Sequence, residues 1–411
     1  MSLAFHPSLE PLLREIGHVA DTVGVRAWVV GGVVRDALRG TSNRDVDITV
    51  EGEAPLLTKA LHATWDTELK KHDAFTTATL HRPDGYHVDI VQARSEVYAR
   101  PGALPTITPG SLEDDLWRRD FSVNAMAAAL NPARFGQLTD PTGGRADLAA
   151  GTIRTLHAGS FRDDPTRLFR AARYAVRLGL SVEEKTDRTA REAVAANALA
   201  TLSGDRLRRS VKRICGERHW AESAEWLNRW ALWEAMTPGF AAAAYLLKRV
   251  DVARSWAARS ALEPLPAVAE LRFLAMLCHA PEELAAALSA KPAEVEIVRR
   301  AHAIANGLDA PDAGEWQRAM DAEAPAVLLL GLTLARTDSG KRRLTEYWEG
   351  VRPQRLSITG DDLIARGAPR GPGLGYALRQ TLDAVRAGRV AGRAAELEYA
   401  MDAVRTHGER Q

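Results

Sequence analysis

The sequence has almost no cysteine and no excess of charge of either sign. Its 411 residues include two cysteines, Cys215 and Cys278. Two isolated thiols exclude a disulfide framework and a zinc site built from cysteines. Lysine and arginine number 54, against 53 aspartate and glutamate residues, so the net charge is +1. Overall charge therefore gives no argument for a nucleic-acid partner, and such an argument has to come from local groups of charges.

Long apolar runs are missing too. The longest, Ala324–Ala335, is shorter than the roughly 20 apolar residues that a membrane-spanning helix needs. The first residues, Met1–Gly17, carry acidic side chains and lack the apolar centre of a secretory signal. We therefore expect a cytoplasmic protein without membrane contact, and nothing in the sequence implies a protein partner. The chain is too long for one compact core, which predicts two to four domains.

The character of the sequence changes near residue 155. Before that point, alternating stretches rich in β-branched residues predict strands. They are AWVVGG (27–32), VDITV (46–50), TTATLHR (76–82) and YHVDIVQ (86–92). From Arg162 on, Ala, Leu, Arg and Glu recur at helical spacing almost to the end, with one Gly/Pro-rich interruption at Arg366–Gly375. This pattern predicts an α+β head followed by an all-helical body.

A glycine pair follows the first predicted strand. Gly31 and Gly32 allow a tight turn that brings bare N–H groups close to a ligand. The helix that begins there attracts phosphate at its N-terminus, and Arg35 adds a positive fork nearby. Glycine pairs after strands are common, so a phosphate site needs further support from the sequence.

Acidic residues supply that support. Asp45 and Asp47 alternate on one strand, so they share a face and lie about 7 Å apart. Their repulsion is relieved when a divalent cation with oxygen ligands binds between them. Asp89 lies among apolar neighbours in another strand, where a shared metal would offset the cost of its burial. Three such carboxylates beside a glycine turn are typical of two-metal phosphoryl transfer.

Other interpretations of these acids stay open. Asp-x-Asp also occurs in metal-dependent glycosyltransferases, and a solvated edge strand with two surface acids is the simplest alternative. His72-Asp73 lacks the histidine spacing of a metal phosphohydrolase.

The stretches GGVVRDALRG and RDVDITV resemble the head motif of the class II (bacterial-type) family of CCA-adding tRNA nucleotidyltransferases and poly(A) polymerases. Four further stretches resemble family motifs in the same order: LEDDLWRRDFSVNAMA (112–127), DPTGGRADLAAGTIR (140–154), FRDDPTRLFRAARYAVRLGL (161–180) and ITGDDLIARGAPRGPGLGYALRQTL (358–382). The resemblance covers nearly the whole chain. It implies a head with a small mixed β-sheet (1–154), followed by an all-helical neck (155–215), body (216–350) and tail (351–411).

The resemblance also implies roles for individual residues. The expected catalytic residues are Asp45, Asp47 and Asp89, with Asp45 and Asp47 holding Mg²⁺ in a two-metal site. The expected triphosphate contacts are Gly31, Gly32, Arg35 and Asp36, and the expected ribose contacts are Arg119, Asp120 and Asn124. Asp164 and Arg167 would select the base, and Arg170 and Arg173 would contact nucleotide or RNA phosphates. The implied partners are CTP, ATP or both, and the 3′ end and acceptor/T-arm region of tRNA.

Two positions depart from the family pattern. Asp163-Asp164 stands where the family usually has Glu-Asp, and Ser210 stands where a following neck motif usually has Glu. The acid that contacts the base is the second of the pair, so its role survives the first departure.

The neck also has a physical interpretation. Asp164 and Arg167 lie three residues apart, on one face at a helix start. A carboxylate accepts from the amine of cytosine or adenine, and a guanidinium donates to the adjacent ring nitrogen. Uracil and guanine would leave these groups unpaired, so the protein itself would act as the template. The simpler interpretation is an acid at a helix start that pairs with Arg at i+3.

Basic residues line the neck helices. Arg170 and Arg173 continue the face that begins at Arg167, and a second basic stripe includes Arg208, Arg209 and Lys212. Such stripes are usually solvated faces. Beside a nucleotidyl site, they predict a path for the tRNA backbone.

The sequence thus predicts a template-independent tRNA nucleotidyltransferase that adds CMP, AMP or both. The segment Ala93–Ser111 is as long as the loop that the family needs for the final A, which favours A addition. A CC-only or A-only member, a poly(A) polymerase, and a helical RNA-binding protein without catalysis are the alternatives.

Overall fold

A computed structural model describes residues 2–65, 67–72, 77–241, 244–260, 264–280, 282–309 and 316–408. Asp73, and Thr76 of one predicted strand, lie outside these ranges. The chain divides into two compact units. The first consists of residues 1–244 and 279–291, and the second of residues 245–278 and 292–411.

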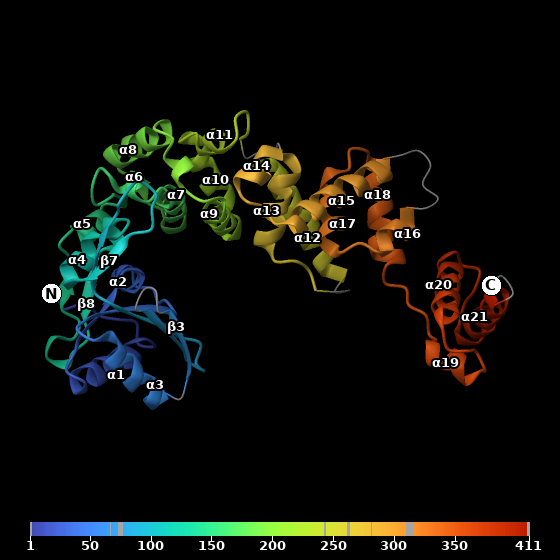
Figure 1. Cartoon of the computed structure of the whole chain (residues 1–411), viewed down its shortest axis with the longest axis horizontal. Coiled ribbons are helices and arrows are strands. Elements are labelled where there is room, and N and C mark those ends of the chain that lie inside the picture. Colours follow the sequence, from blue (N-terminus) through green and yellow to red (C-terminus); the bar gives the residue numbers. More distant parts are fainter. Residues whose placement is uncertain are drawn as a thin grey trace. The chain divides into compact units, whose positions relative to one another are not determined.

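The first unit contains a seven-stranded mixed sheet, with strand order β3-β4-β5-β2-β1-β8-β9. Figure 1 labels β3 and β8 of this sheet. Its strands are β1 (Arg26–Val30), β2 (Asp45–Glu51), β3 (Glu68–His72), β4 (Thr77–His81), β5 (His87–Gln92), β8 (Ala127–Ala129) and β9 (Leu138–Thr139). β2 and β5 run parallel, and the other neighbours are antiparallel. The sheet confirms the predicted α+β head with a small mixed sheet.

The two faces of the sheet differ in chemistry. Val46 and Ile48 of β2 are buried in the main core of the head, to which α1 (Glu10–Thr22) and α3 (Ala54–Trp65) contribute leucines and Ile16. The other face carries a smaller apolar cluster, in which Trp28 and Val30 pack with α4 (Leu112–Trp117). Because side chains alternate along a strand, Asp45 and Asp47 lie on this second face.

Short elements complete the head. α2 (Gly32–Leu38) follows β1, and β6 (Arg94–Val97) pairs with β7 (Thr106–Pro109) in a separate two-stranded ribbon. The other elements are the single 3₁₀ turns η2 (Ser122–Asn124) and η3 (Pro132–Arg134), α5 (Gly144–Ala149) and β10 (Thr152–Ile153). β10 pairs in parallel with β11 (Ser181–Val182) and so connects the head to the helices that follow.

Helices form the rest of the first unit. They are α6 (Ser160–Asp163), α7 (Thr166–Leu178), α8 (Glu184–Ala195), η4 (Ala198–Thr201), α9 (Gly204–Gly216), α10 (Trp220–Arg229), α11 (Leu232–Met236) and α14 (Glu282–Ala287). α7 packs against α9 and α10. Trp220, Trp230 and Trp233 are buried, so they belong to the helical core.

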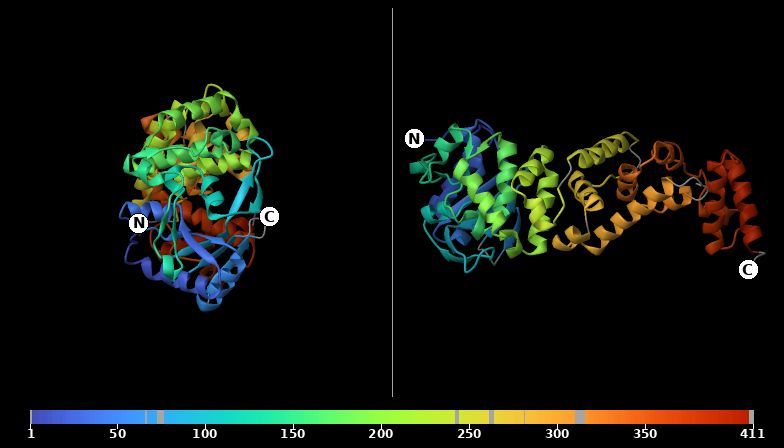
Figure 2. Two further views of the ribbon diagram at one scale, coloured as in Figure 1. Left: turned by 90° about the vertical axis from the view of Figure 1, so that its left-hand side faces the viewer. Right: turned by 90° about the horizontal axis from the view of Figure 1, so that it is seen from above.

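The second unit is helical throughout its described residues, as the orange and red segments of Figure 2 show. Its elements are α12 (Ala244–Ala257), η5 (Ala258–Ser260), α13 (Val268–His279), α15 (Pro292–Asp309), α16 (Trp316–Asp321), α17 (Pro325–Leu334), α18 (Asp338–Glu346), η6 (Tyr347–Val351), α19 (Gly360–Ala365), α20 (Pro372–Arg386) and α21 (Arg393–Gly408). The last three helices share their own apolar core, which includes Leu363 and Ala377. Among the described helices, none combines the length and apolar composition that a membrane crossing requires.

Candidate active site

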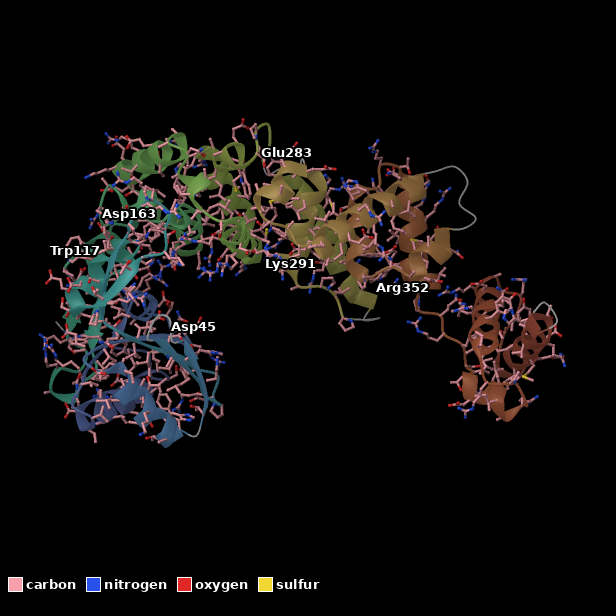
Figure 3. All side chains as sticks on the ribbon, in the orientation of Figure 1. Asp45, Trp117, Asp163, Glu283, Lys291 and Arg352 are labelled. Atoms are coloured by element: carbon pink, nitrogen blue, oxygen red, sulfur yellow. The ribbon has the colours of Figure 1, made fainter. Side chains whose placement is uncertain are left out.

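A cavity of about 610 Å³ opens in the first unit, over the acidic face of the sheet. Figure 3 labels Asp45 on the head and Asp163, the residue before Asp164, at the neck. Most of the predicted site residues line this cavity: Gly31, Gly32, Arg35, Asp45, Asp47, Asp89, Arg119, Asp120, Asn124, Asp164, Arg167 and Arg170. Residues scattered over 140 positions of sequence thus meet at one place. Asp36, Arg173, Arg208, Arg209 and Lys212 are not part of its lining.

The three predicted catalytic acids lie on adjacent parallel strands. Asp47 of β2 is directly opposite Asp89 of β5, and Asp45 is two residues away on the same face. Asp89 is half-buried, and its Oδ1 accepts a hydrogen bond of 2.5 Å from Thr79 Oγ1. The surrounding protein partly desolvates the Asp47 carboxyl, although the residue stays accessible through the cavity, and this raises its pKa. The charges of Asp89 and Asp45 raise that pKa further. Arg119 opposes this rise.

This acid group fits a divalent cation only in part. Asp45 and Asp47 are accessible, supply hard oxygen donors and repel each other. Within the described ranges, no three His, Cys, Asp or Glu side chains are close enough together to hold a metal ion. Mg²⁺ usually binds through one or two carboxylates and takes its remaining ligands from water and substrate phosphates. The site therefore fits a cation that arrives with a triphosphate.

The turn after β1 requires glycine. Gly31 has a φ of +68°, in the region that glycine adopts without strain. A Cβ on Gly31 would also lie 2.9 Å from Arg119 Nη1. Bare backbone at Gly31 and Gly32 therefore borders the cavity.

Arg35 is buried, and its guanidinium is already engaged. Its Nη1 donates to Asn124 Oδ1 at 2.6 Å, and its Nε donates to Asp36 Oδ1 at 2.9 Å. Asp36, which does not line the cavity, thus holds the Arg35 side chain through this hydrogen bond. The structure assigns the two residues a mutual positioning role, beside the triphosphate contacts that the resemblance implies.

The predicted ribose contacts form a hydrogen-bonded chain. Asn124 Nδ2 donates to Asp120 Oδ1 at 3.2 Å, and Asp120 Oδ2 accepts from Arg170 Nε at 2.7 Å. Burial alone would raise the pKa of Asp120, but Arg170 and Asn124 hold that pKa below its ordinary value. Because Arg35 also donates to Asn124, this series of hydrogen bonds links α2 to the neck helix α7.

The two residues that are predicted to select the base, Asp164 and Arg167, are held by separate partners. Asp164 Oδ1 accepts from Thr166 N at 3.0 Å, from Thr166 Oγ1 at 2.7 Å and from Arg206 Nη2 at 2.9 Å. Arg167 is buried and donates to Ser160 Oγ at 2.6 Å and to Arg118 O at 2.8 Å. The structure therefore does not show the simple i,i+3 ion pair, because each side chain reaches the cavity with its own support.

Arg206 is a site residue that the sequence did not single out for this role. Besides Asp164, it donates from Nη1 to Gly102 O at 2.6 Å. Gly102 lies between β6 and β7, within the predicted loop 93–111, and its N–H donates to Arg162 O and Asp163 O at 3.3 and 3.2 Å. The ribbon is thus joined to the neck beside Asp164. Its Leu104 and Pro105 also line the cavity.

The predicted tRNA-binding residues of α9 divide between different faces. Arg209 lines a second cavity, of about 270 Å³, together with Arg206, Ser210 and Arg213. Arg208 instead pairs with Asp205 at 3.1 Å, and Arg208 and Lys212 are absent from the lining of both cavities. Helical geometry explains the division, since 206, 209, 210 and 213 share one face and 208 and 212 lie beside it.

A mixed sheet with acids on one face, a glycine turn beside them and a helical neck above defines a nucleotidyltransferase head. Residues 27–154 match the family described as "Poly A polymerase head domain". The chain is 33% identical to the A-adding tRNA nucleotidyltransferase of Geobacter sulfurreducens, over 93% of this chain and 45% of that protein. It is 34% identical to the CC-adding tRNA nucleotidyltransferase of Deinococcus radiodurans, over 85% of this chain and 82% of that protein.

The fold resembles a solved structure as well. The Thermotoga maritima CCA-adding enzyme, solved in complex with tRNA, superposes with a TM-score of 0.71 at 27% identity, over 97% of this chain and 96% of that one. The chain therefore belongs to the bacterial-type family of CCA-adding tRNA nucleotidyltransferases and poly(A) polymerases. It spans about half the length of the first relative, the Geobacter enzyme, at 45%.

Proposed function

We propose that this protein transfers CMP, AMP or both from CTP and ATP to the 3′ end of tRNA and releases diphosphate. The observation that carries the proposal is the shared cavity, where the acids of β2 and β5 face the neck residue Asp164. The names of the relatives, which are A-adding and CC-adding tRNA nucleotidyltransferases, support the same reaction. A tRNA substrate also accords with a cytoplasmic place of action.

In this proposal, Asp45 and Asp47 hold Mg²⁺, with Asp89 completing the acidic face. When bound, Mg²⁺ supplies Lewis-acid stabilisation of the triphosphate and lowers the pKa of the attacking 3′ hydroxyl. The chain's own residues position the substrates. Gly31 and Gly32 would offer backbone N–H groups to the triphosphate, and Arg119, Asp120 and Asn124 would contact the ribose. This division of roles accounts for the pairing of acidic and basic walls in one cavity.

The base would be read by Asp164 and Arg167. The hydrogen bonds that Asp164 accepts from Thr166 and Arg206 all use Oδ1, so Oδ2 is available to a ligand. That oxygen is suited to accept from the amine of cytosine or adenine. Arg206 holds the carboxylate in place, and the buried Arg167 supplies the donor. A base with a carbonyl at the amine position would face an acceptor and lose the interaction.

The subtype within the family is inferred from the ribbon formed by β6 and β7. The ribbon residues Leu104 and Pro105 line the cavity, and Gly102 is joined to the neck through Arg206. A ribbon that contacts the base-reading residues favours an enzyme able to add the terminal A. CC-only addition, A-only addition and poly(A) synthesis are the alternatives. We further propose the division into head (1–154), neck (155–215), body (216–350) and tail (351–411), the last of which has its own apolar core.

The decisive experiment supplies two tRNA substrates, one lacking CCA and one ending in CC. Each is incubated with CTP alone, ATP alone and both, in the presence of Mg²⁺, and the products are resolved at single-nucleotide length. Extension by defined residues supports the proposed function and identifies the subtype. A long run of A residues would indicate poly(A) synthesis. No extension of either substrate would contradict the proposal and leave an RNA-binding protein without catalysis.

A further inference from the structure

A second cavity lies beside the catalytic one, between α7 and α9 of the first unit. It has a volume of about 270 Å³ and shares Asp164, Arg170 and Arg206 with the catalytic cavity. Arg173, Arg209 and Arg213 complete its basic lining. Five arginines and a single acid thus surround a space that adjoins the site of transfer.

The charges of this cavity are only partly balanced. Arg170 pairs with Asp120, Arg173 with Glu217 and Arg206 with Asp164. In the part of the chain that the structure describes, Arg209 and Arg213 have no ion pair with a carboxylate. Both residues are exposed and line the cavity from α9. Partial desolvation by the surrounding protein and the like charges of Arg173 and Arg170 lower the pKa of the Arg213 guanidinium, although the residue as a whole is exposed.

Ser210 explains why this positive charge is not neutralised. It lies on the same face of α9, one turn from Arg206 and Arg213, and its Oγ donates to Arg206 O at 2.9 Å. The family motif that the neck resembles usually has Glu at this position. A glutamate there would reach the guanidinium groups of the cavity and supply the missing negative charge. The smaller, uncharged serine leaves space in the cavity and leaves the positive charge of the arginines available to a ligand.

We propose that the cavity between α7 and α9 binds a phosphodiester of the RNA strand whose 3′ end enters the catalytic cavity. The inference rests on the proposed function, because it takes RNA as the substrate. Arg209 and Arg213 contact the phosphate, and Ser210 keeps the site open to it. A guanidinium group can donate to two phosphate oxygens at once. The site would therefore recognise the RNA backbone and not the bases. The same chemistry would accept free diphosphate, the product of transfer, so the experiment separates the two sources.

The test compares Ser210→Glu with Ser210→Gln, which have nearly the same size and differ in charge. Equilibrium binding of a tRNA ending in CC is measured between 50 and 200 mM salt, roughly the range over which phosphate contacts change affinity most clearly. We expect Ser210→Glu to bind roughly three- to tenfold more weakly than Ser210→Gln and to show a salt slope smaller by about 0.7, the loss of one single-strand phosphate contact. Thermal unfolding should show that both variants are folded.

Two further variants locate the contact. Arg213→Gln should lose affinity and salt slope as Ser210→Glu does. Arg188→Gln is the matched control, because Arg188 is an exposed arginine of α8, 3.8 Å from Glu184, outside both cavities. It should leave both quantities unchanged. Equal tRNA affinity in Ser210→Glu and Ser210→Gln would overturn the proposal.

The two sources of phosphate are separated by competition. Inorganic diphosphate should displace the tRNA from Ser210→Gln no better than from Ser210→Glu. If Ser210→Glu weakens diphosphate binding and leaves tRNA binding intact, the cavity holds free anion and the proposal is wrong. Nucleotide transfer at saturating tRNA gives an independent readout. If the wild type transfers nucleotides but the two Ser210 variants bind tRNA equally, the phosphodiester site is refuted and the proposed function stands. If the wild type transfers no nucleotide, the proposed function itself is refuted.

Discussion

Arg170 and Asp120 join the neck to the head, because Arg170 Nε donates to Asp120 Oδ2 at 2.7 Å and Nη2 lies 2.6 Å from the same oxygen. Asp120 is 7% exposed and also accepts from Asn124 and from the backbone of Phe121. The pair therefore fixes the position of the neck helix and the charge state of a buried carboxyl at the same time.

Removing the arginine should destabilise the protein strongly. Arg170→Ala leaves the Asp120 carboxylate buried without its cation, which typically costs about 3–5 kcal/mol. In the wild type the pKa of Asp120 is lowered, so its contribution is present above the ordinary aspartate pKa and is lost as the pH falls through the folded-state pKa. In the variant, burial raises that pKa, so the deficit should shrink as the pH falls. Urea unfolding at several pH values checks both statements, and Arg170→Ala with Asp120→Asn should recover part of the loss.

Asp47 should be required for transfer and costly for stability. Asp47→Asn keeps the size of the side chain and removes its charge. We expect transfer to fall by at least about a hundredfold, since metal assistance contributes several kcal/mol. Binding of tRNA should change little. A variant that keeps more than about a tenth of wild-type turnover would show that Asp47 is not a metal ligand.

The same variant makes a second, thermodynamic prediction. A carboxyl whose pKa is raised in the folded state opposes folding when it is ionised, and this cost is complete only at a pH above that raised pKa. Metal-free Asp47→Asn should therefore melt at a higher temperature than the wild type at pH 8. The difference should shrink as the pH falls through the raised pKa of Asp47. Mg²⁺ should stabilise the wild type more than the variant, which differential scanning calorimetry can measure.

Base choice should depend on Asp164 and on its support, Arg206. Asp164→Ala should relax the discrimination against UTP and GTP more than it weakens triphosphate binding, because it removes an acceptor from the base edge only. Arg206→Ala should give a smaller change in the same direction, since Thr166 still holds the Asp164 carboxylate. Competition among all four nucleotides measures the effect. Unchanged discrimination in both variants would contradict a protein template at this position.

The ribbon can be tested at Gly102. A Cβ on this residue would lie 1.9 Å from Thr201 Oγ1, so Gly102→Ala should displace the ribbon from the neck. We expect AMP addition to tRNA ending in CC to fall more than CMP addition to tRNA lacking CCA. Gly24→Ala is the control, because Gly24 has a similar φ of +72° and open space at its Cβ. Equal losses of AMP and CMP addition would show that the ribbon does not distinguish the last step.

Much of the head was predictable from local patterns. The alternation of apolar and acidic residues in 45–50 predicts both the strand and the shared face of Asp45 and Asp47, because successive strand side chains point to opposite sides. The glycine pair predicts a turn, and Gly31 indeed has a positive φ. The predicted strands that fall within the described residues are all present. The shared strand face and the glycine turn depend only on residues close together in the sequence, because the local backbone conformation determines both.

Pairings between distant residues were decided by the tertiary structure. The sequence alone does not place Asp47 opposite Asp89, since that register depends on how β2 and β5 pair. It predicts a basic face on α9 but not that Arg209 lines a cavity while Arg208 pairs with Asp205, because the docking of α9 on α7 selects the face. Arg206 reaches Asp164 and Gly102 only because the neck folds beside the ribbon. Local composition sets which side chains are available, and packing decides which of them meet.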